Sequence, residues 1–567
     1  MAEIESIKIQ NYKSIKNLEL ILPKNKPVAL IGENNAGKTN ILKAIHLILG
    51  ERYPGNFSPQ VNDFFKRQEK DIKISVNFSE NLGASNFNKL VLKHDVDNSK
   101  TELIATIGST GEETKYINNS DRNKLNSVYI DAEKNLTYQL SYKSKYTFLS
   151  KLMRKFHGEI KQDEELYSEL KDNFAKTKEL FRKVERFADF REQLRGDFDD
   201  FTASMPHSLE VDFEAFDPTN FFHALQLQPV ENEEVRAFGE IGSGEKQVLS
   251  LSFIYAYAKS FHEDVLLLIE EPESNLHPLA QHFLSEKLKN IAKKDKVQVI
   301  FSTHNASFIN LLNVEGLSSV FKNDEEETEI KQLDRDNLVD YCKDRGAKKA
   351  TADNIAEFYA NHSTKRIKEG FFASKIILVE GPSESFSLPI YLKKIGLDIY
   401  KKSIDVISAE GKDNIAKWVR IFSAYNISVY VIFDNDNEDD KKCEKRKNIL
   451  NSLNLANFSE DVFEEDSFVI KDKYAVFGLD FEKTFRSLFP KYREKEKEAI
   501  EKGIRGKKFI AKYAASNIDK SNEKGWKKIE QLKEKIVSLN YQPEDIEDKY
   551  DSNNEGDLEI DPEDIPF

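Results

Sequence analysis

The stretch Gly32-Glu-Asn-Asn-Ala-Gly37-Lys38-Thr39 decides the fold of the first part of this chain, because it matches the pattern G-x-x-x-x-G-K-S/T. It follows an apolar run at 28–31 and precedes residues 40–49, whose apolar side chains recur at helical spacing. A glycine turn between a buried strand and a helix lets backbone N–H groups surround a phosphate, and the helix N-terminus adds partial positive charge. This context favours a phosphate-binding turn over a chance glycine loop.

Side chains of the turn would complete a nucleotide site. Lys38 is expected to reach the β- and γ-phosphates of ATP, and Thr39 is expected to hold Mg²⁺. The residues expected to contact the nucleotide here are Gly32, Asn35, Gly37, Lys38, Thr39 and Asn40.

A second segment supports the nucleotide site. The apolar run at 265–269, VLLLI, is followed by Glu270-Glu271-Pro272. A buried strand that ends in two acids suits a site where Glu270 binds Mg²⁺ and Glu271 polarises the attacking water. The alternative is a strand followed by a solvated acidic turn.

Three further segments complete a recognisable order. Residues 242–247, GSGEKQ, open a predicted helix, 273–278 read ESNLHP, and 299–304, VIFSTH, form an apolar run ending in histidine. This order resembles the ABC-type ATPases of the recombination and SMC group. The resemblance implies that His304 is the switch histidine and that a signature segment contacts the γ-phosphate across a dimer, through Ser243, Gly244 and Glu245. Glu245 replaces the second Gly of the fuller LSGGQ pattern.

The nucleotide site itself suggests a homodimer or higher homo-oligomer. A phosphate cradle on one protomer leaves one side of the γ-phosphate exposed, and a serine and helix N-terminus from a second protomer can complete the shell. ATP would then bridge the two copies, and hydrolysis would weaken their contact. The Q-loop residue stays open between Gln60 and Asp63.

The C-terminal part carries three groups of acids. They are 378–384, LVEGPSE, after a predicted strand, Asp434-Asn435-Asp436 after the apolar run 428–433, and 478–482, GLDFE. Acids at the carboxyl ends of parallel strands converge at one edge of a sheet. Their oxygens suit Mg²⁺ or Mn²⁺, and two such ions can act together on a phosphodiester. The alternatives are a solvated acidic loop at 434–440 and a helix N-terminus at 380–384.

Glu380-Gly381, followed along the chain by the two acids Asp434 and Asp436, resembles the pattern of a Toprim domain. An ABC-type ATPase followed by Toprim in one chain resembles the OLD (overcoming lysogenization defect) family of endonucleases, with which Gabija-type and retron-associated anti-phage nucleases are grouped. The resemblance covers about residues 1–485. It implies the metal ligands Glu380, Glu384, Asp434, Asp436 and Glu482, leaves Asp480 open as an additional ligand, and makes Glu380, Asp434 and Asp436 catalytic.

The same resemblance implies a C-terminal lysine that stabilises transition-state charge. Gly506-Lys507-Lys508 is the only segment that fits, although the proline usual after the first lysine is absent. Lys507 is the first choice, and Lys508 stays open. A solvated helix face is an equal alternative for either lysine.

The chain is therefore expected to be a multidomain α/β protein. The predicted segments are an ATPase N-lobe at 1–144, a helical insertion at 145–207 that could dimerise, an ATPase C-lobe at 208–333, a helical connector at 334–370, a Toprim domain with a helical C-terminal part at 371–540, and an acidic tail at 541–567 that is too charged to bury a core.

Composition limits the remaining choices. Among 567 residues, 84 are Lys or Arg and 98 are Asp or Glu, for a net charge of −14, which leaves room only for local basic surfaces. Two cysteines, Cys342 and Cys443, give neither a disulfide framework nor a zinc pattern, as is typical of the cytoplasm. We expect no signal peptide and no membrane span.

The resemblance implies an ATP-regulated, divalent-metal-dependent DNA endonuclease in anti-phage defence, which acts with a partner protein or a retron nucleic acid encoded nearby. A topoisomerase-like enzyme is an alternative, since 21 tyrosines could supply a nucleophile. A DNA clamp with a regulatory Toprim domain is another. A primase is the weakest alternative because no zinc cluster is visible.

Overall fold

The computed structural model describes most of the chain. The described residues are 3–50, 52–82, 86–115, 117, 125–131, 147–186, 188–190, 192–194, 230–231, 234–235, 242–260, 264–294, 297–435, 444–455, 468–521 and 523–539. The chain forms two compact units: Met1–Tyr129, Leu266–Glu273 and Gln281–Phe567 make the first, and Ile130–Val265 and Ser274–Ala280 the second. This division is coarser than the six segments predicted from the sequence, so those boundaries stay predictions. Asp436 and the acidic tail lie outside the described residues.

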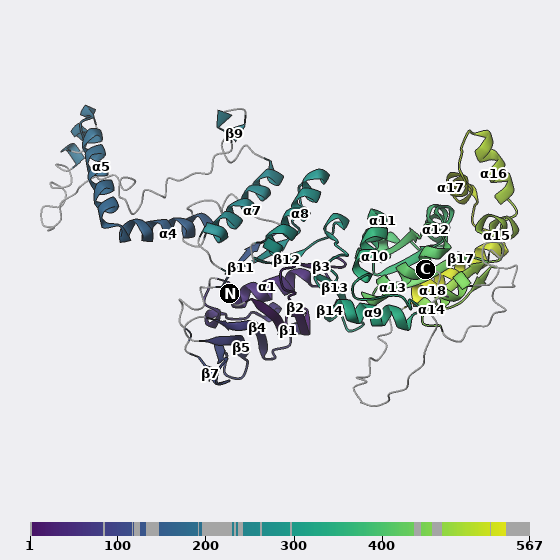
Figure 1. Cartoon of the computed structure of the whole chain (residues 1–567). Coiled ribbons are helices and arrows are strands. Elements are labelled where there is room, and N and C mark those ends of the chain that lie inside the picture. Colours follow the sequence, from purple (N-terminus) through teal and green to yellow (C-terminus); the bar gives the residue numbers. More distant parts are fainter. Residues whose placement is uncertain are drawn as a thin grey trace. The chain divides into compact units, whose positions relative to one another are not determined.

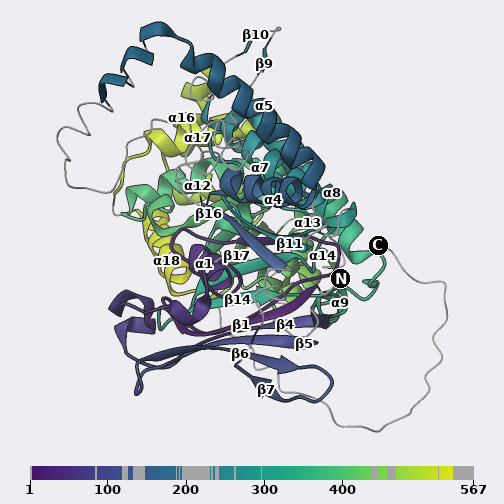
Figure 2. The same ribbon diagram turned by 90° about the vertical axis from the view of Figure 1, so that its left-hand side faces the viewer.

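An antiparallel sheet opens the first unit. Its strands, in the order β2-β1-β4-β5-β6-β7, are β1 (Ile4–Tyr12), β2 (Ile15–Ile21), β4 (Ile72–Leu82), β5 (Phe87–Asp95), β6 (Lys100–Ile107) and β7 (Glu113–Thr114). Figure 2 shows β1, β4, β5 and β6 side by side. Ile7 and Ile9 are buried while Lys8 and Gln10 are exposed, as expected for a strand with one buried face. The sequence patterns at residues 71–78 and 102–107 also favour strands, and the structure has β4 and β6 there; β5 was not predicted.

A second, mostly parallel sheet carries the glycine-rich turn. Its order is β14-β13-β3-β12-β11-β8, with β3 (Val28–Ile31), β8 (Leu125–Ile130), β11 (Asp264–Glu270), β12 (Gln298–Ser302), β13 (Leu317–Lys322) and β14 (Thr328–Gln332) (Figure 1). β3 pairs in parallel with both β12 and β13, and β11 pairs in parallel with β12. All four residues of β3 are buried, because a central parallel strand is covered on both faces.

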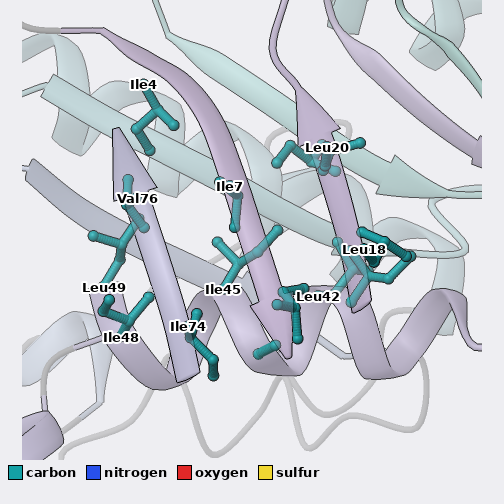
Figure 3. Close-up of a cluster of buried hydrophobic side chains, with 14 of the residues drawn as sticks. Ile4, Ile7, Leu18, Leu20, Leu42, Ile45, Ile48, Leu49, Ile74 and Val76 are labelled. Carbon is teal, nitrogen blue, oxygen red and sulfur yellow. The ribbon is translucent and has the colours of Figure 1, made fainter. Parts of the chain in front are cut away.

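Helix α1 (Lys38–Leu49) packs between these two sheets, since it contacts β1 and β4 on one side and β12 on the other. Figure 3 shows Leu42 and Ile45 of α1 close to Ile7 of β1, with Ile48 near Ile74 of β4. Each of these side chains is fully buried, and such burial stabilises by about 1.5–3 kcal/mol per side chain. The helix, and therefore the turn at its N-terminus, is fixed by this core.

The third sheet belongs to the C-terminal half. Its order is β16-β15-β17-β19-β18, with β15 (Lys375–Val379), β16 (Ile404–Ser408), β17 (Ser428–Asp434), β18 (Val469–Ile470) and β19 (Tyr474–Phe477). The pairs β15–β16, β15–β17 and β17–β19 are parallel. The carboxyl ends of β15, β17 and β19 therefore lie at one edge of the sheet, where the three acidic groups begin.

Helices accompany this sheet. They are α12 (Pro382–Lys394), α13 (Lys412–Ala424), α14 (Glu444–Ser452), α15 (Phe481–Leu488), α16 (Tyr492–Glu501), α17 (Lys507–Asn517) and α18 (Lys524–Ser538). The predicted helical connector contains α9 (Arg335–Asp344), α10 (Ile355–His362) and α11 (Lys365–Glu369). Helices thus occur in the segment predicted as a helical connector and in the C-terminal part of the predicted Toprim segment.

The second unit is mainly helical where it is described. It contains α4 (Phe148–Gln162), α5 (Glu164–Arg182), α7 (Ser243–Ser260) and a two-stranded antiparallel hairpin, β9 (Val230–Glu231) with β10 (Glu234–Val235). Helix α8 (Pro278–Lys294) begins in this unit and continues in the first. None of the described helices is long and apolar enough to cross a lipid bilayer.

Candidate functional site

Two glycines shape the turn that joins β3 to α1. Gly32 has φ +129° and Gly37 has φ +113°, conformations that L side chains rarely adopt. A Cβ atom at Gly32 would lie 2.1 Å from the carbonyl oxygen of Val320, and one at Gly37 would lie 2.3 Å from Thr328 Oγ1. Between them Asn35 is exposed and has φ +64°. A side chain at either glycine would collide with β13 or β14, so only glycine lets the backbone of this turn form a cradle that suits a bound phosphate.

Lys38 folds back into this cradle. Its ammonium donates to the carbonyl oxygen of Gly32 at 2.9 Å and to that of Glu33 at 2.6 Å. Burial lowers the pKa of Lys38 to about 8, against the opposing effect of Glu271, Glu33 and Glu273. An anionic phosphate beside this ammonium would stabilise its charged form.

The two residues after Lys38 have different surroundings. Thr39 is partly exposed in the first turn of α1. The Asn40 amide donates to Ser14 Oγ at 2.7 Å, and Ser14 Oγ also accepts from Thr328 Oγ1 at 2.8 Å. Asn40 thus ties the start of the helix to the β1–β2 turn, while Thr39 remains the residue placed to meet a cation.

The paired acids follow β11. Glu270 is its last residue, is buried, and accepts a hydrogen bond from the Tyr129 hydroxyl at 2.8 Å. The Tyr129 ring stacks on His46 of α1 with centroids 5.3 Å apart. Glu271 has φ +41°, and its N–H donates to the carbonyl oxygen of Ser302. The parallel pairing of β11 with β12 therefore brings both acids to the end of β12.

Glu273 orders the turn that carries His304. Its Oε1 accepts from Thr303 Oγ1 and from the His304 N–H, both at 2.8 Å. Within the described part of the chain, its buried Oε2 has no hydrogen-bond partner. Burial raises the pKa of Glu273, with a contribution from Glu271. Burial and the nearby Lys38 lower the pKa of His304, so the imidazole is neutral at pH 7.

The predicted signature residues lie in the second unit. Ser243 is exposed as the first residue of α7, and Glu245 accepts from the N–H of Gly242 at 3.0 Å. A Cβ at Gly244 would lie 2.5 Å from the carbonyl oxygen of Asn275. The helix therefore begins with an exposed serine and a glycine that packs against the segment after the paired acids.

The two Q-loop candidates have structural contacts. Gln60 and Asp63 bracket a short 3₁₀ turn, and the Asp63 carboxylate accepts from the Gln60 N–H at 3.0 Å. The other Asp63 oxygen lies 2.7 Å from Lys13 Nζ. Asp63 thus stabilises its own turn, and the geometry assigns a Q-loop role to neither residue.

At the third sheet, Glu380 and Asp434 come together. Both end neighbouring parallel strands, and the Asp434 N–H donates to Glu380 Oε2 at 3.2 Å. Lys412, whose side chain is 5% exposed, places its ammonium 3.9 Å from the same Glu380 oxygen. The predicted meeting of these two strand ends is present in the structure.

Glu384 joins this cluster from the first turn of α12 and is almost fully buried. Burial raises its pKa to about 7, and Glu380 and Glu482 add to the effect. Burial also raises the pKa of Asp434 to about 9, with further contributions from Glu384 and Glu380 and an opposing one from Lys412. Among the described residues, Asp434 Oδ1 is buried without a hydrogen-bond partner. A buried carboxylate oxygen without a donor, next to other carboxylates, is suited to a cation.

The third acidic group divides into two roles. Glu482 accepts from Ser383 Oγ at 2.9 Å, which links α15 to the start of α12. Asp480 caps α15 by accepting from the Lys483 N–H at 2.6 Å, and it also lies 3.3 Å from Lys483 Nζ. Glu482 is therefore linked to the acidic cluster through Ser383, which precedes Glu384, whereas Asp480 already stabilises the start of α15.

The described residues alone do not complete a metal site. Among them, no three Asp, Glu, His or Cys side chains lie close enough together to hold a metal ion. Asp436, predicted as a ligand, lies outside those residues. Its neighbour Asn435 is buried and accepts from the fully buried Arg446, which fixes the end of β17. The ligand set as a whole stays a prediction.

The two candidate lysines differ in position. Lys507 lines a cavity of about 430 Å³ together with Asp480 and Glu482. Lys508 instead places its ammonium over the rings of Phe386 and Phe509, 5.4 and 5.1 Å from their centroids. The geometry favours Lys507 as the lysine of the acidic site.

Comparisons with known proteins match both halves of the chain. Residues 28–310 match a family of AAA domains whose description names AbiEii toxins of Type IV TA systems. Residues 371–436 match the family described as overcoming lysogenization defect protein-like, TOPRIM domain. The OLD nuclease of Thermus scotoductus is 26% identical over 452 residues, which cover 76% of this chain and 82% of the relative. The Old nuclease of Escherichia phage P2 is 23% identical over 484 residues, which cover 76% and 77%.

The chain belongs to the OLD family. It combines the ATPase fold, with its N-terminal sheet, and the Toprim domain that the family joins in one polypeptide. A solved Smc head domain from Pyrococcus furiosus is also similar, with 16% identity, a TM-score of 0.37 and coverage of 59% of this chain and 96% of that one.

Sequence reasoning missed several residues of this OLD-family chain. Tyr129 contacts Glu270 although 141 positions separate them, and no local pattern marks it. Glu273 was noted only as part of a segment, although an acid three residues after Glu270 in a strand-end turn was a usable signal. Ser383 lies inside the quoted EGPSE segment, but its contact with Glu482 spans 99 positions.

Proposed function

We propose that this chain is a divalent-metal-dependent DNA endonuclease whose cutting is controlled by ATP. The observation that carries the proposal is the buried Oδ1 of Asp434, which has no hydrogen-bond partner among the described residues and lies with Glu380 and Glu384 at the end of parallel strands. The family membership supports a nuclease that carries an ATPase domain, since two relatives bear the name OLD nuclease. The proposal adds three points to this family membership: the dependence on a metal, DNA as the substrate, and the control of cutting by ATP.

The acidic site would act on the phosphodiester. Glu380, Glu384, Asp434, Asp436 and Glu482 would hold Mg²⁺ or Mn²⁺, with Asp480 as an additional ligand. When bound there, divalent cations supply the positive charge that offsets these carboxylates and polarises the phosphodiester. Lys507 would stabilise negative charge that develops on the phosphate during hydrolysis.

The nucleotide site would bind ATP with Mg²⁺. The glycine-rich turn, Lys38 and Asn35 would hold the phosphates, Thr39 and Glu270 would meet the cation, and Glu271 would orient water. His304, neutral at pH 7, can accept or donate a proton in a hydrogen bond at the end of β12. A second copy would supply Ser243, Gly244 and Glu245, so that ATP links two protomers.

Control of cutting by ATP is supported by a continuous set of contacts in the first unit. The His304 ring lies 6.1 Å from that of Phe372, and α11 contacts the 3₁₀ turn Ala306–Phe308 that follows His304. Phe372 ends the turn Gly370–Phe372, three residues before β15 begins. β15 in turn ends next to Glu380. A shift at the switch histidine can therefore be passed to the strand that carries an acidic ligand.

A plasmid-cleavage assay with varied Mg²⁺, Mn²⁺ and ATP tests the proposal. Wild type should nick or cut DNA, Asp434→Ala should abolish cutting while ATP binding persists, and Lys38→Ala should abolish ATP binding and the ATP dependence of cutting. Asp472→Ala is a matched control, because Asp472 is an exposed acid that pairs with Lys535 away from the cluster. Cutting by Asp434→Ala at the wild-type rate would refute the assignment.

We also propose a role in defence against phages, exercised in the cytoplasm with a trigger encoded nearby. The support is the sequence resemblance to Gabija-type and retron-associated nucleases. Plaque counts on bacteria carrying the wild-type gene with its neighbours, compared with the Asp434→Ala gene, test this role. Equal protection by both genes would favour a non-catalytic clamp instead.

A further inference from the structure

A cavity next to the acidic site has not been given a task by the proposed function. It has a volume of about 430 Å³ and is lined by residues of α15, α16 and α17. Glu482 and Lys507 belong both to its lining and to the proposed acidic site. The cavity is therefore continuous with the place where DNA would be cut.

After ion pairs within the lining are set aside, the cavity has more basic than acidic side chains. Arg486 and Glu496 neutralise each other through a two-pronged ion pair, with N–O distances of 2.7 and 2.8 Å. Arg493, Lys497 and Lys507 also line the cavity, and in the part of the chain that the structure describes they form no ion pair. Two further acids line the cavity, Glu482 and Asp480, and Asp480 pairs with Lys483. The three cations still outnumber these two carboxylates, so the surface attracts an anion.

One buried donor has no protein partner. Tyr492 is one of the residues that line the cavity, its side chain is fully buried, and its hydroxyl finds no hydrogen-bond partner among the described residues. Buried hydroxyls are nearly always hydrogen-bonded, because an unmade bond costs free energy. A phenol is neutral at pH 7 and can donate to an anionic oxygen. This hydroxyl is an independent sign that a ligand with acceptor oxygens completes the site.

We propose that this cavity binds a backbone phosphate of the DNA substrate, adjacent to the phosphate that is cut. Arg493 and Lys497 neutralise the phosphate, and the Tyr492 hydroxyl donates to one of its oxygens. The proposal rests on the proposed nuclease function, because it assigns the ligand to DNA. A phosphate from a free nucleotide has the same chemistry, so the test must separate the two sources.

The first test compares two buried tyrosines. Tyr492→Phe and Tyr391→Phe each remove a buried hydroxyl that lacks a partner, but only Tyr492 lines the cavity. Both changes should raise the melting temperature of the DNA-free protein, because both remove an unsatisfied polar group. Only Tyr492→Phe should weaken DNA binding, by about two- to tenfold, the loss of one hydrogen bond. Fluorescence anisotropy of a labelled duplex with Ca²⁺ in place of Mg²⁺ measures affinity independently of cutting.

The second test removes charge. Arg493→Ala should weaken DNA binding and reduce the slope of log affinity against log salt concentration by about 1, the loss of one phosphate contact. Lys491→Ala removes a charge from the start of the same helix, outside the cavity lining, and should leave this slope near its wild-type value. The cavity could instead bind the phosphate of a free nucleotide. Anisotropy of labelled ATP tests this in variants that also carry Lys38→Ala, so that the ATPase site does not bind the label.

Unchanged DNA affinity and salt slope in both Tyr492→Phe and Arg493→Ala would overturn the proposal. Loss of ATP binding without loss of DNA binding in these variants would also overturn it, in favour of a nucleotide site. The nuclease function fails separately, when wild type binds DNA but does not cut it with any divalent cation. Affinity and cutting are thus read independently.

Discussion

Replacing Asp434 by Asn removes an ionisable carboxyl group from the acidic cluster with little change in shape. Burial and the neighbouring Glu384 and Glu380 raise the pKa of Asp434 to about 9, from 3.8 in an unfolded chain. Between these values the folded metal-free protein holds a proton that the unfolded chain has released. Stability without metal must therefore fall as the pH rises from about 4 to about 9.

The size of this effect follows from proton linkage. Each pH unit within the window costs about 1.4 kcal/mol per proton, so the metal-free wild type can lose up to about 5 kcal/mol between pH 4 and pH 8. Asn cannot ionise, so Asp434→Asn should be more stable than wild type at pH 8 without metal, and the difference should vanish towards pH 4. Added Mg²⁺ should stabilise wild type and leave Asp434→Asn nearly unchanged.

Thermal unfolding at pH 5 to 8, with a chelator or with Mg²⁺, measures both effects. Asp472→Asn serves as the control, because the ion pair of Asp472 with Lys535 lowers the pKa of this exposed acid. That variant should show neither a gain at pH 8 nor a loss of the Mg²⁺ effect. If metal-free Asp434→Asn is less stable than wild type at pH 8, or responds to Mg²⁺ as wild type does, the reasoning about the cluster is wrong.

Three other predictions concern the supporting contacts. Gly37→Ala should abolish binding of fluorescent ATP and cost about 1–3 kcal/mol in chemical unfolding, because it strains the backbone and meets Thr328; ATP binding at wild-type affinity would contradict this. Tyr129→Phe should reduce steady-state ATP turnover about fivefold, since Glu270 loses a donor worth roughly 1 kcal/mol; unchanged turnover would show that this bond does not position the acid. Ser383→Ala should weaken Mg²⁺ binding about tenfold in calorimetry, and equal affinity would show that its contact with the acidic cluster is incidental.

Local patterns in the sequence predicted the parts of both sites that depend on neighbouring residues. The apolar residues of β3 and the two glycines lie within ten positions, so the phosphate turn could be predicted from them alone. The same holds for Glu380 and Asp434, because each follows a continuous apolar strand and parallel strands bring such ends together.

Contacts between distant segments could not be predicted in this way. Tyr129 and Tyr492 are ordinary aromatic residues in the sequence, and only the packing of their strand and helix shows that one reaches Glu270 and the other a charged cavity. Strand β5 was missed because its buried residues run together as Leu90-Val91-Leu92 instead of alternating. Asp63, which the sequence left open as a Q-loop residue, caps a turn and pairs with Lys13 in the structure, and these contacts were likewise not visible in a local pattern.

The charges of the acidic site also imply an order of events for the proposed reaction. Glu380, Glu384 and Asp434 lie close together, and a counter-charge beside them in the described part of the chain is Lys412, whose ammonium is 3.9 Å from Glu380. A DNA phosphate is itself anionic, so the metal-free cluster would repel it, whereas the cations of the neighbouring cavity would attract it. DNA should therefore bind in the absence of metal through the cavity, with its phosphate held away from the carboxylates. Divalent cations bound by the carboxylates would reverse the repulsion, so adding them should tighten DNA binding in wild type more than in Asp434→Asn, which lacks one of the carboxylates that would hold the cation.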